Sequence, residues 1–161
     1  MRRTLVMGNW KMHGSRASVS RLLQDIVPEL IAGQTVDVAV CPTYVHLAEA
    51  VAACAGSPLE VGAQDCSHMS SGAYTGEVAA EMLRDIGCEW VLIGHSERRQ
   101  YHTESDDLLQ AKVAVAVTAG LRPVLCVGET LEQRQDGEAE RVVAGQLHGA
   151  LGNQMDLDGL A

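Results

Sequence analysis

Residues 90–99 read Trp-Val-Leu-Ile-Gly-His-Ser-Glu-Arg-Arg, an apolar run that ends at a glycine and passes at once into five polar side chains. A short apolar run bounded by a glycine has the length and composition of a buried β-strand. Four other stretches have the same character, and each is short enough to be one strand: residues 5–8, 36–40, 59–63 and 123–128.

Amphipathic stretches with helix-start and helix-stop signals lie between these runs. The clearest is residues 105–120, where Ser105 and two aspartates precede an apolar pattern that ends at Gly120. An N-cap serine and early carboxylates both stabilise the positive end of a helix. We expect other helices from Ser15 or Ser18 through Ile31 to near Gly33, from Thr43 through Val51, over residues 77–86, and after Gly137 through Leu147.

Strands that alternate with helices predict parallel strands joined by right-handed crossovers, which is an α/β fold. The strands begin about 30 residues apart, which matches the spacing in an eight-unit (β/α)₈ barrel of about 250 residues. A doubly wound sheet fits the same alternation. No G-x-G-x-x-G follows the first strand, however, where a dinucleotide-binding sheet would place it.

Composition narrows the functional classes. The 161 residues fit one domain, and 21 acidic against 12 basic side chains give a formal charge of −9. That charge argues against a nucleic-acid partner and an anionic membrane surface. Five dispersed cysteines without a C-x-x-C argue against disulfides or a zinc site, and no apolar run is long enough for a signal or membrane segment. We therefore expect a soluble, cytoplasmic protein without a metal.

Polar residues follow the first and fourth strands, at the sheet end where α/β active sites assemble. Asn9 and Lys11 are two residues apart and would share a face if the strand continued there, which suits an anionic or carbonyl substrate. His95 would begin a helix, whose dipole favours the neutral ring. Glu97 is either an acid–base group or an ion-pair partner of Lys11 or the following arginines. A solvated lysine and an ion-paired helix end remain the simpler alternatives.

The polar residues after the fifth strand are Cys126 and Glu129. No histidine or helix end is assigned beside Cys126, so we interpret it as a structural thiol and not as a nucleophile. We interpret Glu129 as an ion-pair partner or a helix-start carboxylate. The other histidines lack ligand spacing, and we assign no metal role to His46, His68, His102 and His148.

Taken together, these segments resemble the triosephosphate isomerase family, in its bacterial form. The matching stretches run over nearly the whole chain in the family's order: residues 8–11 (Gly-Asn-Trp-Lys), 62–65 (Gly-Ala-Gln-Asp), 72–77 (Gly-Ala-Tyr-Thr-Gly-Glu), 93–99 (Ile-Gly-His-Ser-Glu-Arg-Arg), 104–106 (Glu-Ser-Asp) and 123–130 (Pro-Val-Leu-Cys-Val-Gly-Glu-Thr).

The resemblance implies a homodimeric (β/α)₈ enzyme of glycolysis and gluconeogenesis that interconverts dihydroxyacetone phosphate and glyceraldehyde 3-phosphate without a cofactor. It implies that Asn9 and Lys11 bind substrate and that His95 polarises the carbonyl, for which this family is the standard example. By the same resemblance Glu97 is a catalytic, proton-handling residue, and Ser96 and Cys126 support the site. Residues 64–77 match a loop that reaches a second subunit, with Gln64, Tyr74, Thr75 and Gly76 as its contact residues.

The sequence departs from the family at three places. His13 and Asp65 stand where asparagine is common, and the family's sixth strand, with its glutamate base, lid and later phosphate loops, has no match in this sequence. We therefore expect the N-terminal five units of a barrel, partial or closed between chains, with residues 152–161 as a flexible tail. Two functions follow: an isomerase that this chain carries in part, or a non-catalytic folding and self-assembly module.

Overall fold

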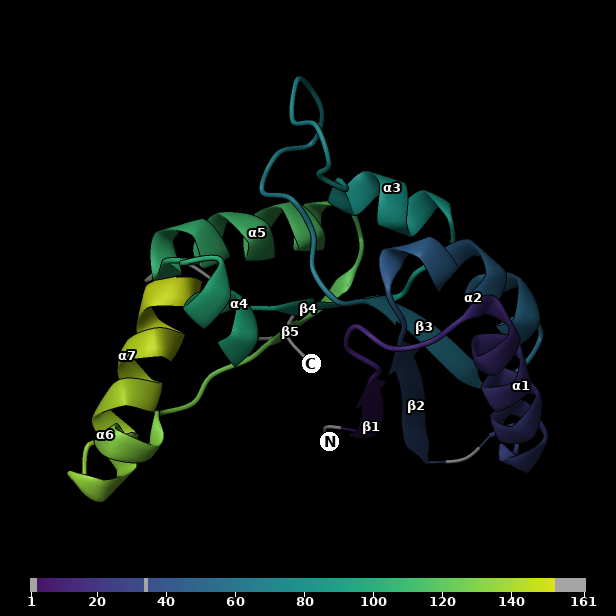
Figure 1. Cartoon of the computed structure of the whole chain (residues 1–161), viewed down its shortest axis with the longest axis horizontal. Helices are drawn as coiled ribbons and strands as arrows, with labels where there is room; N and C mark the ends of the chain where they lie inside the picture. Colours follow the sequence, from purple (N-terminus) through teal and green to yellow (C-terminus); the bar gives the residue numbers. More distant parts are fainter. Residues whose placement is uncertain (1–2, 34, 153–161) are drawn as a thin grey trace.

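The computed structural model describes residues 3–33 and 35–152, which form a curved five-stranded parallel sheet (Figure 1). The strands lie in sequence order, β1-β2-β3-β4-β5. This order has no reversal, whereas a doubly wound sheet has one at its switch point. The bounds are β1 Thr4–Asn9, β2 Val36–Cys41, β3 Leu59–Ala63, β4 Trp90–Ile93 and β5 Arg122–Leu125.

Helices follow every strand and lie on the outside of the curve, with α1 and α2 toward one end and α7 at the other (Figure 1). None of the helices in the described part of the chain is long and apolar enough to cross a membrane. The helices are α1 Arg16–Ile26, α2 Leu47–Cys54, α3 Ala80–Asp85, α4 Ser96–Tyr101, α5 Asp106–Thr118, α6 Leu131–Gln135 and α7 Ala139–Leu151, with short 3₁₀ turns at η1 Val27–Glu29 and η2 Tyr44–His46.

One face of the sheet carries the core. Strand register places a single set of alternate side chains on that face, and all of them belong to or pack on the core with residues from the helices: Val38, Val40, Leu59, Val61, Ala63, Val91, Ile93 and Leu125. One-sided cover is the arrangement of a (β/α)₈ barrel wall, since a doubly wound sheet is covered on both faces. The molecule is therefore an arc of such a barrel.

The concave face is polar at the amino-terminal ends of the strands. The Trp90 indole Nε1 donates to Glu60 Oε2 at 2.6 Å, and Arg122 Nη2 lies 2.6 Å from Glu60 Oε1. The Arg122 guanidinium also stacks 3.8 Å from the centre of the Trp90 ring, a cation–π geometry. These contacts join β3, β4 and β5 on the side that faces away from the helices.

The structure corrects several expected boundaries. The first helix ends at Ile26, well before Ile31, because Pro28 follows and cannot continue an α-helix. Thr43 precedes a 3₁₀ turn without making a side-chain cap. The short helix α6 was expected only as one alternative, in which Glu129 is a helix-start carboxylate. The caps of Ser15 and Ser105 are confirmed. Of the expected tail over residues 152–161, residues 153–161 lie outside the described residues.

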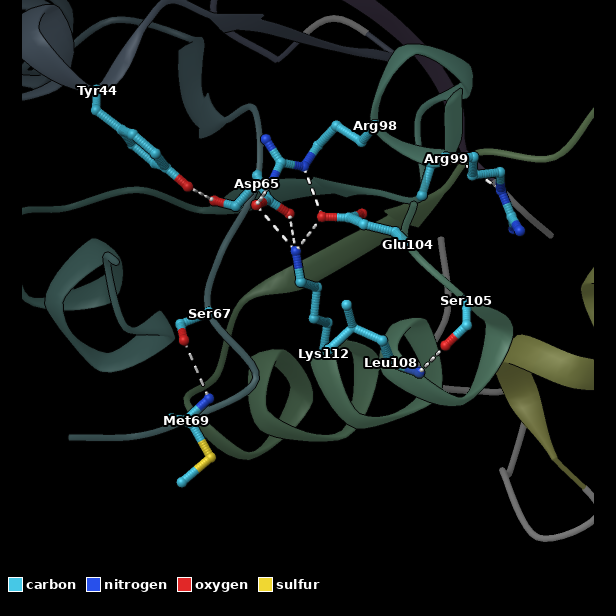
Figure 2. Close-up of polar contacts among 11 residues, drawn as sticks. Tyr44, Asp65, Ser67, Met69, Arg98, Arg99, Glu104, Ser105, Leu108 and Lys112 are labelled. Carbon is cyan, nitrogen blue, oxygen red and sulfur yellow. Dashed lines mark hydrogen bonds and ion pairs between the residues drawn. The ribbon is translucent and has the colours of Figure 1, made fainter. Parts of the chain in front are cut away.

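The buried ammonium group of Lys112 links helix α5 to the segment after β3 and to the segment after α4 (Figure 2). Lys112 of α5 is 3% exposed, and its Nζ donates to Asp65 Oδ1 at 2.7 Å and to Glu104 Oε1 at 2.6 Å. Arg98 of α4 reaches the same two carboxylates, and the Tyr44 hydroxyl donates to the Asp65 carbonyl oxygen. The cluster thus fixes α4 relative to the end of β3.

The pKa values of the two carboxyl groups of this cluster, Asp65 and Glu104, shift in opposite directions. Burial raises the pKa of Asp65, and the charges of Lys112 and Arg98 do not fully offset it. Burial also acts to raise the pKa of Glu104, but hydrogen bonds from Lys112 and Arg98 outweigh it and hold that pKa below its ordinary value. Folding therefore favours the ionised form of Glu104.

We expect Lys112→Met to lower the free energy of unfolding by about 3–5 kcal/mol, because it leaves two buried carboxylates without their ammonium partner. Urea unfolding at pH 7, followed by far-UV circular dichroism, measures the change. Gln110→Met, at an exposed position of the same helix, is the matched control and should change stability by no more than about 0.5 kcal/mol. Equal losses in the two variants would contradict this assignment.

We expect the cost of Glu104→Gln to depend on pH. A carboxyl whose pKa is lowered in the folded state stabilises the protein above its unfolded pKa, and that contribution is lost as the pH falls through the folded value. The variant should therefore be clearly less stable than the parent at pH 7, with the gap narrowing below pH 4.5, the ordinary pKa of that group. A gap that widens on acidification would reverse the assignment.

Candidate active site

An open cleft of about 550 Å³ lies at the carboxyl ends of the strands. Active sites of parallel α/β proteins form at this end, because the loops that follow the strands meet there. The cleft brings together residues at or after the ends of four different strands: Asn9, Lys11, Met12, His13, Thr43, Tyr44, Gln64, Asp65, His95, Glu97, Arg98, Tyr101 and His102.

Lys11 enters the cleft through an unusual backbone conformation. β1 ends at Asn9, so the strand does not continue to Lys11, and Lys11 adopts φ +51°. Few residues other than glycine adopt this left-handed region, and such strain gathers at functional sites. The Asn9 side chain accepts the Lys11 N–H at 2.9 Å, and Gln64 Nε2 donates to the Lys11 carbonyl oxygen at 2.9 Å. These contacts hold the strained turn.

Lys11 and Glu97 form an ion pair across the cleft, with Lys11 Nζ 2.8 Å from Glu97 Oε1. The hydrogen bond from Lys11 lowers the pKa of Glu97. Both side chains are about half exposed, 48% and 46%, so solvent screens the pair and a ligand can compete for the lysine. Of the alternatives weighed for Glu97, its partner is Lys11; Arg98 and Arg99 pair with other carboxylates.

His95 occupies the N-cap position of α4. Its Nδ1 accepts the backbone N–H of Glu97 at 3.3 Å and also lies 3.4 Å from Glu97 Oε2. The backbone N–H is a fixed donor, so we assign the lone pair to Nδ1 and the proton to Nε2; the carboxylate contact is then not an ion pair. In this assignment Nε2 carries an N–H donor, and no described residue accepts from it.

A second, smaller cleft of about 300 Å³ lies between the ends of β4 and β5 and shares His95 with the first. Ser96 and Cys126 line it. Cys126 is half-buried, and burial raises the pKa of its thiol, so a nucleophilic thiolate is disfavoured. Glu129 pairs with Arg134 at 3.0 Å, as expected for an ion-pair partner.

The expected contact loop divides into two parts. Gln64 is not at the exposed tip, because it donates to the Cys41 and Lys11 carbonyl oxygens at the base of the cleft. Tyr74, Thr75 and Gly76 are exposed, on a segment that projects beyond the helices at the top of Figure 1. The loop tip therefore stands away from the arc, while its base belongs to the cleft.

Sequence reasoning missed the support beneath the cleft. Tyr44 and Lys112 were not singled out, and Arg98 was considered only as a possible partner of Glu97; Tyr44 and Arg98 line the cleft, and Lys112 holds Asp65. One signal was available: Lys112 lies beside Leu109, Val113 and Ala116, which are buried residues of the same helix. A charged side chain within such a stripe is buried only with a partner.

Comparison with known proteins gives a consistent result. The family model for triosephosphate isomerase matches residues 4–159. A triosephosphate isomerase of Nitrosococcus oceani is 48% identical over 94% of this chain and 60% of its own length. One of Thiobacillus denitrificans is 52% identical over 91% of this chain and 58% of its own length. The chain thus spans about 60% of the length of these relatives. By sequence and by fold, the chain belongs to the triosephosphate isomerase family.

Proposed function

We propose that this chain carries the carbonyl-polarising and charge-compensating part of a triosephosphate isomerase site, whose substrates are dihydroxyacetone phosphate and glyceraldehyde 3-phosphate. One observation carries the proposal: the side chains of His95 and Lys11 line the same cleft and both contact Glu97, His95 by accepting its backbone N–H at Nδ1 and Lys11 by donating to its carboxylate. The names of the relatives agree with it.

The chemistry of the cleft suits an enediolate. Proton removal beside a carbonyl places negative charge on the carbonyl oxygen, and a preorganised donor stabilises that charge more strongly than water does. The His95 Nε2–H would donate to this oxygen. The Lys11 ammonium would offset the charge of the phosphate and of the enediolate, once the substrate replaces part of its contact with Glu97. Asn9 holds the Lys11 turn and adds an amide to the cleft wall.

None of the described residues that line the cleft is a carboxylate available as the general base for proton abstraction. Their two carboxylates are Glu97 and Asp65. Asp65 is buried against Lys112 and Arg98, and Glu97 is paired with Lys11. A general base must reach the substrate with its own protonation state free to change. We therefore assign polarisation and charge compensation to this chain, not the transfer of the carbon-bound proton.

We propose a homo-oligomer for the functional form. The exposed tip at Tyr74, Thr75 and Gly76 projects from the arc, and the resemblance implies that such a tip contacts a second subunit.

The alternative function, a non-catalytic folding and assembly module, is favoured by the open sheet, whose two outer strands have no further partner strand in the described chain. A cytoplasmic location is supported by the five cysteines, all unpaired.

We expect the isolated 161-residue chain to show no isomerase turnover from its own site. A coupled assay with glyceraldehyde 3-phosphate measures this, and His95→Gln should leave the background rate unchanged. A rate within about tenfold of a full-length relative, abolished by His95→Gln, would contradict the assignment of roles, because chemistry without a positioned base forfeits about 10²- to 10⁴-fold in rate.

We expect a chimera to reveal the assigned roles. Residues 1–152 of this chain, joined to the remaining part of the Thiobacillus denitrificans relative, should isomerise triose phosphates. In that chimera His95→Gln should lower kcat by about 10²- to 10³-fold, the typical loss for one oxyanion donor. His148→Gln, an exposed histidine of α7, is the matched control. Equal activity in the parent chimera and the His95 variant would remove His95 from the mechanism.

A further inference from the structure

Lys11 has both of its backbone polar groups bonded by side chains. Asn9 Oδ1 accepts the Lys11 N–H, and Gln64 Nε2 donates to the Lys11 carbonyl oxygen, each at 2.9 Å. Lys11 also adopts φ +51°, a left-handed conformation that a lysine rarely adopts without support. Its ion pair with Glu97 is about half exposed, and such a pair is too weak to hold a strained backbone. The two side-chain contacts therefore fix the conformation of Lys11.

The two contacts differ in what they fix. Asn9 lies two residues before Lys11 and belongs to the same segment, so its contact holds the local shape of the turn. Gln64 follows β3, and the same Nε2 also donates to the carbonyl oxygen of Cys41, the last residue of β2, at 2.8 Å. One amide group thus joins the ends of β2 and β3 to the segment after β1.

The chemistry of Gln64 matches its two partners. Both partners are carbonyl oxygens, and the NH₂ group of an amide has two hydrogens, one for each. A carboxylate in this place would set oxygen against oxygen, and an apolar side chain would leave both carbonyls without this donor. The amide of Gln64 is therefore the group that ties the Lys11 turn to the sheet.

The next residue, Asp65, holds the segment that carries the partner of Lys11. Its carboxylate lies 2.9 Å from Arg98 Nη2 of α4. The same short helix carries Glu97. Gln64 and Asp65 are therefore adjacent in the chain, and each contacts the segment of one partner of the Lys11–Glu97 pair.

We propose that Gln64 is the positioning residue for the Lys11 ammonium, which it places within reach of Glu97 in the cleft. Gln64 acts through the carbonyl group of Lys11, at the other end of that residue from the ammonium. Asp65 meanwhile keeps α4 in place opposite. The importance of this contact for a phosphorylated substrate rests on the proposed function, in which Lys11 offsets negative charge. The contact itself can be tested without turnover.

Glu97 provides the readout, because the hydrogen bond from Lys11 lowers its pKa. Carbon-13 NMR of the Glu97 carboxyl group measures this pKa in the 161-residue chain. Lys11→Met removes the ammonium and defines the pKa without it, while the smaller effect of His95 is retained. Gln64→Met keeps the side-chain length, removes both donor hydrogens and should raise the pKa of Glu97 by at least half of that difference. Gln24→Met, at an exposed position of α1, is the matched control and should leave the pKa unchanged.

The lysines provide a check on folding in the same samples. The chain has two lysines, so carbon-13 labelling of lysine gives two signals, from the half-exposed Lys11 and the buried Lys112. In folded Gln64→Met, the Lys112 signal should stay in place while the Lys11 signal moves toward that of a solvated lysine. Gln64→Asn keeps an amide but is one methylene shorter, and it takes the place of Gln64→Met if that variant loses the Lys112 signal.

The proposal is overturned if the folded variant keeps the parental pKa of Glu97, or if Gln24→Met raises that pKa equally. It is also overturned if both Gln64 variants lose the Lys112 signal, because Gln64 would then support the whole fold and not the Lys11 turn.

This test and the tests of the proposed function fail separately. An unchanged pKa of Glu97 in Gln64→Met would leave the role of His95 standing. An inactive chimera, or one insensitive to His95→Gln, would leave the placement of Lys11 by Gln64 standing.

Discussion

The one-sided burial of the sheet is the constraint on which the rest of the structure depends. The core helices pack on the same face, so each strand places alternate side chains in a core and the others on a concave surface. Strands in such a wall run in the same direction, which collects their carboxyl ends at one rim. The cleft, the loop tip and the two outer edges are all consequences of this arrangement.

The site itself depends on a very short helix. α4 has six residues, too few to be stable alone, yet it carries Glu97 and is capped by His95. Its position comes from ion pairs: Arg98 with Asp65 and Glu104, and Arg99 with Asp106. The buried Lys112 ammonium completes this frame from below. The polar residues at the rim are therefore positioned by charges that contact no substrate.

The sequence predicted most of the fold because the signals were local. The strand at residues 59–63 appears with the expected bounds, and the helix from Asp106 to Thr118 begins at its serine cap and ends at the expected glycine. The site was harder to predict. The Lys11 turn departs from the strand through a left-handed residue, and a lysine carries no glycine-like signal for that. The Asp65–Lys112 contact joins residues 47 positions apart, a separation that periodicity does not report.

The sequential order of the strands also bears on how the sheet folds. Each strand pairs with the one made just before it, from β1 to β5, so every pairing joins neighbouring strand–helix units of the chain. During synthesis a nascent chain can add one strand–helix unit at a time to an existing template, since no pairing within the arc waits for a distant segment. Glu60 of β3 hydrogen-bonds Trp90 of β4 and Arg122 of β5. These contacts link the three strands on the concave face, near their amino-terminal ends. A five-unit arc is therefore the structure expected when five strand–helix units of a barrel have been added in order. The outer edge of β5 is the edge to which a following strand would pair.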